Sequence, residues 1–194
     1  MLRISKVGFV YLLLLICSYT PNLFGQNVVI VYYSEQGHTK AMAEAVAKGA
    51  DTSTSAKVRL LPVDKATGDD LLWADAVIIG SPVHSANVAA PIQKFLSHMP
   101  WDQKMKDKVG AAFVTGGGIS AGEELAQLNI LHGMLIYNMI VVGGPTWNQA
   151  FGASGVTQEE PFNGGVDPKF LARGQALGKR VAEISKRLSS STKQ

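Results

Sequence analysis

The chain has one cysteine in 194 residues, and it has no apolar run of the roughly 20 residues that a membrane-spanning helix needs. The single cysteine, Cys17, excludes a disulfide framework within the chain. Basic residues exceed acidic ones by only 18 to 15 and form no clustered stripe, so a nucleic-acid partner is not expected. Neither a Walker phosphate loop nor a G-x-G-x-x-G dinucleotide fingerprint occurs.

The longest apolar stretch lies at the start of the chain. Residues 7–17 are unbroken by a charge and follow Arg3 and Lys6. A basic start, a short apolar stretch and a small residue before a cleavage point are typical of a secretory signal, here cut after Gly25. The organisation expected is therefore a signal peptide at residues 1–25, one domain at 26–188 and a disordered tail at 189–194. Loss of the signal removes both basic residues and lowers the formal net charge from +3 to +1.

Two other interpretations of this stretch are open. It can stay uncleaved, so that residues 7–19 anchor the protein in a membrane, or Cys17 can carry a lipid. The expected location is outside the cytoplasm, periplasmic or extracellular, after cleavage.

The remaining sequence alternates short β-branched runs with segments of helical periodicity. The runs are typical of strands buried on both faces. Strands are expected at 27–33, 57–62, 75–80, 109–115 and 136–142, and helices at 37–50, 88–98, 123–135 and 167–188. This alternation predicts an α/β fold, a doubly wound parallel sheet with helices on both faces.

A sheet of this kind binds its ligand in loops at the carboxyl ends of its strands. The first such loop, 34–39, carries hydroxyls at Ser34 and Thr39 around Gly37, directly before a helix start. Backbone N–H groups there form a site for an anion, and the absence of Lys or Arg within the loop suits a phosphate that does not react. An ordinary capped helix start is the other interpretation. Loops 81–87 and 115–120 are the second and third, and residues 143–167 form a long segment that is functional or partly disordered.

Several segments together resemble a known family. Residues 30–46 (IVYYSEQGHTKAMAEAV) fit the phosphate-loop signature of flavodoxins. With the segments at 76–82, 131–134, 151–154 and 172–182, the chain resembles the WrbA-type NAD(P)H:quinone oxidoreductases over residues 28–188. The last two segments separate this family from simple flavodoxins.

The resemblance implies a flavodoxin-like sheet of five parallel strands in the order 2-1-3-4-5, with FMN held non-covalently. It implies a hydride passing from NAD(P)H to the flavin and two electrons passing on to a quinone. Homo-oligomers, tetramers or dimers, are implied as well, with flavin sites completed across subunits. The cofactor-binding residues implied are Ser34, Glu35, Gln36, Gly37, His38, Thr39, Ser81, Pro82, Val83, His84, Thr115, Gly116, Gly117, Gly118 and His132.

Two residues beyond the loops complete the predicted site. His132 matches a family histidine beside the flavin and is a candidate for proton donation. Trp101 falls near a family tryptophan over the outer flavin face and is predicted to contact substrate. A structural role for His132 and a loop anchor for Trp101 are the alternatives, and no residue is named as a certain acid, base or nucleophile.

Departures from the family pattern support a different function. His84-Ser85 stands where relatives carry Arg-Phe, and Gln36 replaces a common tyrosine near the nicotinamide. An exported protein would also meet little NAD(P)H. The alternative is therefore an exported electron carrier or FMN-binding protein without NAD(P)H turnover. A degenerate domain without flavin is disfavoured by the intact phosphate signature.

Overall fold

The computed structural model describes residues 26–54 and 56–191. The predicted signal peptide, with Cys17 and the alternative anchor, lies outside the described residues. Within the described part, no helix has the length and apolarity to cross a membrane.

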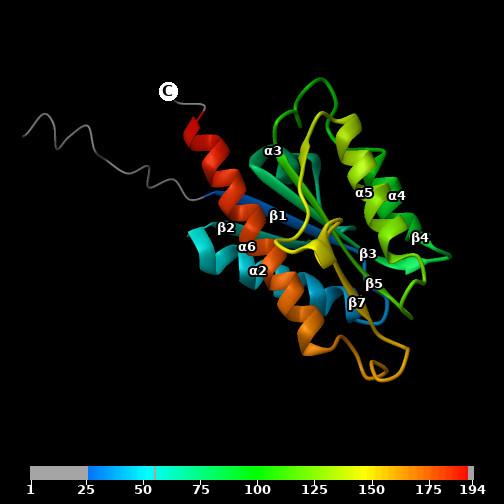
Figure 1. The fold of residues 1–194 in the computed structure, drawn as a ribbon. Helices are drawn as coiled ribbons and strands as arrows, with labels where there is room; N and C mark the ends of the chain where they lie inside the picture. Colours follow the sequence, from blue (N-terminus) through cyan, green and yellow to red (C-terminus); the bar gives the residue numbers. More distant parts are fainter. Residues whose placement is uncertain (1–25, 55, 192–194) are drawn as a thin grey trace, which may run out of the picture.

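A parallel sheet forms the centre of the molecule (Figure 1). Its strands β1 (Asn27–Tyr32), β2 (Lys57–Pro62), β3 (Ala76–His84), β5 (Val109–Gly116) and β6 (Ile140–Val141) lie in the order β2-β1-β3-β5-β6. The predicted fold class and the order 2-1-3-4-5 are thereby confirmed, with β5 as the fourth parallel strand.

The fifth position of the sheet is shared by two short strands. β6 pairs with the first residues of β5, and β7 (Ala153–Val156) pairs with its last four. Between them the chain leaves the sheet through a short 3-10 turn, η1 (Trp147–Gln149). The strand predicted at 136–142 is therefore placed too early, because residues 136–139 complete a helix and the turn that follows it. β7 lies within the segment 143–167, for which no strand was predicted.

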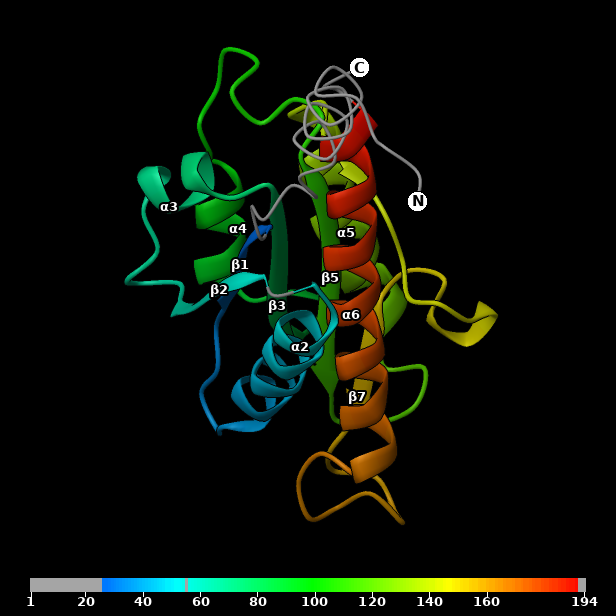
Figure 2. The same cartoon turned by 90° about the vertical axis from the view of Figure 1, so that its left-hand side faces the viewer.

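Helices cover both faces of the sheet. α2 (His38–Thr54) and α6 (Pro168–Ser191) lie side by side on one face, as Figures 1 and 2 show. α3 (Gly68–Trp73), α4 (Ala90–Leu96) and α5 (Glu123–Ile136) lie on the other. Alternate residues of β1 point to opposite faces, so Ile30 joins the core under α2 and α6, and Val29 joins the core under the other helices.

α2 runs four residues beyond its predicted end at residue 50 and contains Gly49. Close backbone contact with α6 explains why a glycine stands there. A Cβ on Gly49 would lie 1.9 Å from the carbonyl oxygen of Gln175 in α6. A Cβ on Gly178 would lie 2.0 Å from the carbonyl oxygen of Val46 in α2. Glycine at these crossing points lets the two helices approach more closely than any side chain would permit.

The two ends of the domain meet at the same side of the sheet. The amide oxygen of Gln26 accepts hydrogen bonds from the hydroxyls of Ser185 and Ser189, both at 3.1 Å. α6 accordingly extends through Ser191, three residues beyond its predicted end, so that residues 189–191 are helical.

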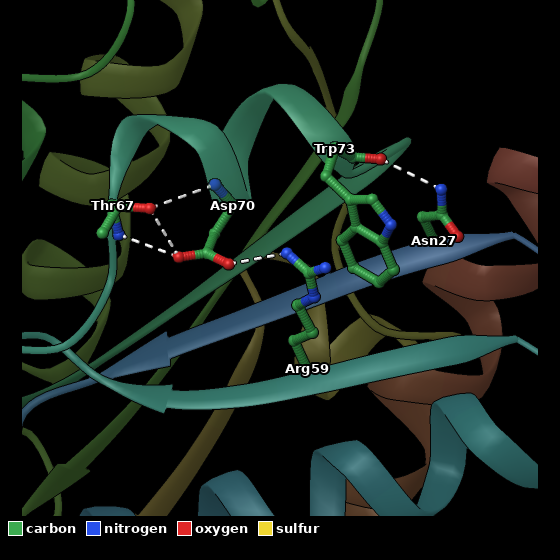
Figure 3. A network of polar contacts seen from close by, with 5 residues as sticks. All are labelled: Asn27, Arg59, Thr67, Asp70 and Trp73. Carbon is green, nitrogen blue, oxygen red and sulfur yellow. Dashed lines mark hydrogen bonds and ion pairs between the residues drawn. The ribbon is translucent and has the colours of Figure 1, made fainter.

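Helix α3 was not expected from the sequence, and polar contacts hold it in place (Figure 3). The Thr67 hydroxyl accepts a hydrogen bond from the Asp70 amide, and the Asp70 carboxylate accepts one from the Thr67 amide, which forms a capping box. The Arg59 guanidinium donates to Asp70 at 2.7 Å and stacks on Trp73 at 3.9 Å from the ring centroid. These contacts, the Thr67 hydrogen bonds first, lower the pKa of Asp70.

Candidate functional site

Three loops meet at the edge of the sheet where β1, β3 and β5 end. They enclose a cavity of about 140 Å³. Its lining comprises Ser34, Glu35, Gln36, His38, Thr39, Pro82, Val83, His84, Thr115, Gly116, Gly117, Thr157 and Gln158. Most of the residues predicted to bind the cofactor are therefore brought together, although they come from three distant parts of the sequence.

The first loop presents unpaired backbone amides to the cavity. α2 begins at His38, directly after Gly37, whose φ of +88° is a left-handed conformation that glycine adopts without strain. The first N–H groups of a helix have no partner inside it. The Lys40 amide is capped by the Ser34 hydroxyl at 3.2 Å. The amides of His38 and Thr39 have no such cap within the described residues, and they lie at the positive end of a 17-residue helix.

A buried hydrogen bond joins the first loop to the third. The hydroxyls of Thr39 and Thr115 lie 2.8 Å apart, and the two residues are only 1% and 4% exposed. This contact fixes the start of α2 against the end of β5. The two helix-start amides and the glycine loop therefore have a defined relative position.

The segment after β7 closes the cavity, and sequence reasoning missed its two lining residues. The Thr157 hydroxyl donates to the carbonyl oxygen of Gly116 at 3.1 Å. The Gln158 amide donates to the carbonyl oxygen of Gly117 at 3.0 Å. The only signal for them was the length of the segment 143–167, which identified no particular residue.

Three titratable side chains lie at the cavity rim. The Tyr33 hydroxyl donates to the Glu35 carboxylate at 2.8 Å, and His84 Nε2 lies 3.9 Å from the other Glu35 oxygen. The hydrogen bond to Glu35 is the main reason that the pKa of Tyr33 is raised, with burial and the negative charge adding to it. His84 and Glu35 both remain about half exposed, so solvent reaches the pair.

The second loop differs from its predicted form. β3 continues to His84 and folds back through β4 (Asn87–Val88) as a hairpin, with Ser85 and Ala86 at φ of +49° and +58°. Two central residues with positive φ are the geometry of a tight hairpin turn whose twist matches its strands. Because neither Ser85 nor Ala86 is a glycine, the sequence did not indicate this turn. A Cβ on Gly122 would lie 2.5 Å from Ala86 Cα, so the hairpin tip contacts the residue directly before α5.

Two residues of the second and third loops that were predicted to bind the cofactor, Ser81 and Gly118, do not line the cavity. Ser81 is fully buried, and its hydroxyl accepts from the Ala89 amide at 2.9 Å and donates to the Pro82 carbonyl oxygen at 2.7 Å. It therefore positions the hairpin from behind and does not line the cavity. Gly118 is also absent from the lining, and it passes beside Glu159, whose carboxylate accepts from the Ile119 amide at 2.6 Å.

Trp101 and His132 lie away from the cavity. Trp101 is 59% exposed in the loop before β5, at the opposite end of that strand, and packs edge-to-face on Tyr137 at 4.9 Å between ring centroids. His132 is exposed on α5, nine residues beyond the helix start near the cavity, which is about 14 Å along the helix axis. Neither residue reaches the cavity of its own chain, and their roles stay predictions.

The arrangement can hold an anion beside a planar ring without reacting with either. Backbone amides and hydroxyls supply neutral donors, and no lysine or arginine lines the cavity. In the described part of the chain, no group of three or more His, Cys, Asp and Glu side chains is placed to hold a metal ion. The neutral donors of the cavity thus favour non-covalent binding of a phosphate.

Comparisons with known proteins show which family this chain resembles. Residues 62–153 match the family described as NADPH-dependent FMN reductase. A flavodoxin of Aquifex aeolicus is 34% identical over 164 residues, which cover 81% of this chain and 85% of the relative. An NAD(P)H dehydrogenase (quinone) of Rhizobium meliloti is 30% identical, with coverage of 82% and 92%. The crystal structure of a WrbA-like flavodoxin from Agrobacterium tumefaciens superposes with a TM-score of 0.68 at 24% identity, over 84% of this chain and 99% of the other.

The sheet order and the three-loop cavity define a flavodoxin-like α/β protein. With the relatives above, the chain belongs to the flavodoxin-like family of FMN-binding oxidoreductases, as a WrbA-type member.

Proposed function

We propose that this protein binds FMN in the three-loop cavity and transfers two electrons from NAD(P)H to a quinone. The observation that carries the proposal is the pair of uncapped amides at the start of α2, in residues that line a cavity without lysine or arginine. Ser34 and the amides of His38 and Thr39 would hold the phosphate. The cavity is smaller than the roughly 300–1,000 Å³ of typical ligand sites. It fits the phosphate and its chain, and the flavin ring would extend to the edges of the second and third loops.

The chain's own residues would position the cofactor and control its surroundings. FMN supplies the hydride and electron chemistry when bound. Pro82 to His84 and Thr115 to Gly117 would hold the two sides of the ring with backbone groups. The His84 imidazole lines this edge of the cavity, with its Nε2 3.9 Å from the Glu35 carboxylate.

An oligomer is part of the proposal, because Trp101 and His132 are exposed far from their own cavity. Trp101 lines a surface hollow together with Ile136 of α5, which is 67% exposed. His132 and Ile136 are four residues apart and therefore lie on one face of the helix. Contact through this face would bring Trp101 and His132 to a neighbouring subunit's cavity. Light scattering at micromolar concentration is expected to give a dimer or tetramer mass, and a strictly monomeric protein would contradict this arrangement.

An FMN-binding electron carrier is the second candidate, and the Aquifex relative named a flavodoxin favours it. His84-Ser85 and Gln36, which depart from the reductase pattern, point the same way. Export remains a proposal on the strength of residues 1–25. Mass spectrometry of the exported protein is expected to give a chain starting at Gln26.

The two candidates are separated by reduction under anaerobic conditions. The FMN-loaded protein is mixed with excess NADPH while the absorbance of oxidised flavin is followed. Rapid bleaching that added benzoquinone reverses supports the reductase. A protein that binds FMN stoichiometrically but stays yellow supports the carrier, and the same protein reduced by dithionite provides the control.

A further inference from the structure

A second, larger cavity lies on the other side of the glycine loop. Its volume is about 590 Å³, within the range of small-molecule sites. The loop 119–125, the strand β7, the segment before α6 and the first turns of α6 surround it. Its lining residues are Ile119, Ser120, Gly122, Glu123, Glu124, Leu125, Asn148, Ser154, Val156, Phe162, Lys169, Phe170 and Arg173. None of them lines the proposed FMN cavity.

A buried carboxylate faces this cavity without a partner. Glu123 is 7% exposed at the start of α5 and has no hydrogen bond or ion pair among the described residues. Its Oε1 lies close to β5, 3.0 Å from where a Cβ on Gly116 would be. Its two carboxylate oxygens are not fully enclosed by protein. Because no donor of the described residues bonds them, they can accept a hydrogen bond from a ligand N–H in the cavity.

Cations and aromatic rings form another wall of the same cavity. Lys169 Nζ lies 3.8 Å from the ring centroid of Phe162, and Arg173 Cζ lies 5.3 Å from that of Phe170. Neither cation pairs with a carboxylate in the described part of the chain. Both lie in the first two turns of α6. The Asp167 carboxylate caps the start of this helix by accepting from the Lys169 amide at 2.8 Å, so the positive charge of this wall comes from the two side chains. This wall therefore favours an anionic group next to a flat ring.

We propose that this cavity binds an adenosine phosphate. The ring would lie against Phe162, its exocyclic amino group would donate to Glu123, and its phosphate would lie near Lys169 and Arg173. The same chemistry is offered by a free adenine nucleotide and by the AMP half of a nicotinamide dinucleotide. The second source rests on the proposed reductase function, whereas the first does not.

Calorimetric titration of the FMN-loaded protein with AMP and IMP tests the proposal without any turnover. IMP carries a carbonyl oxygen where AMP has its amino group, so the Glu123 carboxylate would repel it. We expect AMP to bind at least about tenfold more tightly than IMP. Glu123→Gln is expected to remove this preference, because an amide can donate to the carbonyl as well as accept from the amine. Absence of AMP binding at millimolar concentration, or equal affinity for AMP and IMP in the unchanged protein, would overturn the proposal.

A double substitution tests the cationic wall. Lys169→Ala with Arg173→Ala is expected to weaken AMP binding by at least about tenfold. The matched control, Lys179→Ala with Arg180→Ala, removes the same charge from exposed positions of the same helix and is expected to leave it unchanged. If both double variants weaken AMP binding equally, the effect comes from the net charge of the protein, and the proposed role of Lys169 and Arg173 is contradicted.

Competition identifies the source of the nucleotide. If the site holds the AMP half of the donor, AMP raises the apparent KM for NADPH linearly with the AMP concentration, as a competitive inhibitor does. If AMP binds without changing that KM, the site takes a free nucleotide. A protein that binds AMP but shows no NADPH turnover would refute the reductase function and leave the nucleotide site standing.

Discussion

Replacing Gly37 with alanine tests the phosphate loop at the point where its backbone is most specialised. Its φ of +88° is one that an L-residue adopts only at a cost of roughly 1–2 kcal/mol. No atom lies within 4 Å of the position that a Cβ would take, so the cost is conformational and not steric. Without ligand the exposed loop can relax into a less strained form, whereas bound FMN requires the native form. We therefore expect the Kd for FMN to rise roughly 5- to 30-fold.

The assay is quenching of FMN fluorescence on titration with apo-protein, and two controls separate the causes. Gly37→Asn is expected to restore most of the affinity, because asparagine tolerates the left-handed conformation. Gly165→Ala imposes a similar strain at a φ of +120° outside the cavity, and it is expected to lower the thermal stability without changing the Kd. Wild-type affinity in Gly37→Ala, with unchanged stability, would refute the role given to this loop.

Three further predictions concern the core and the rim. Gly178→Ala places a methyl group against backbone, so we expect the free energy of unfolding to fall by about 2 kcal/mol and the Tm by roughly 4–8 °C. The neutral control in the same thermal melt is Gly68→Ala, because a Cβ there would lie 3.6 Å from its nearest neighbour. Thr39→Val leaves its buried hydroxyl partner unsatisfied and is expected to cost about 1–3 kcal/mol in urea unfolding, a loss that Thr39→Ser would largely reverse. Glu35→Ala removes the acceptor that stabilises the protonated Tyr33, so the pKa of Tyr33 should fall, which ultraviolet titration against a Tyr33→Phe reference measures; an unchanged curve would contradict the hydrogen bond. Because that pKa is raised on folding, the associated stability is present below the ordinary tyrosine pKa and is lost as the pH rises through the folded value.

The central sheet was predictable because its strands are buried on both faces. β2 matches its predicted bounds, and β1 and β5 differ from theirs by one residue each. A strand covered by helices on both faces must be apolar throughout, which makes its sequence conspicuous. Strand order came from family resemblance, since short apolar runs alone do not encode which neighbours they pair with.

Elements that depend on tertiary contacts were missed. β7 has the sequence ASGV, whose small residues suit a strand only because β5 provides a partner and α6 packs against it. α3 has six residues, less than two helical turns, so its sequence shows no repeating apolar pattern. Its capping box at Thr67 and Asp70 is nevertheless visible in the sequence. The hairpin after β3 needs positive φ at Ser85 and Ala86, residues that do not announce it.

The site was predictable where one loop forms it, and less so where distant segments combine. The loop 34–39 carries its own signature of glycine and hydroxyls. Thr157 enters the cavity only because the chain after β7 returns to Gly116. Ser81 matches the family motif, yet its hydroxyl is used for the hairpin, which a sequence pattern does not distinguish from ligand binding.

The most direct test of the cavity's role compares the affinity of the apo-protein for FMN and for riboflavin, which lacks the phosphate. If the amides of His38 and Thr39 and the Ser34 hydroxyl bind the phosphate, FMN should bind with one molecule per chain. It should also bind at least about 100-fold more tightly than riboflavin, an effect that two of these three charge-assisted hydrogen bonds alone would produce. Equal affinity for the two flavins, or no binding of either, would contradict the assignment of this cavity to the FMN phosphate.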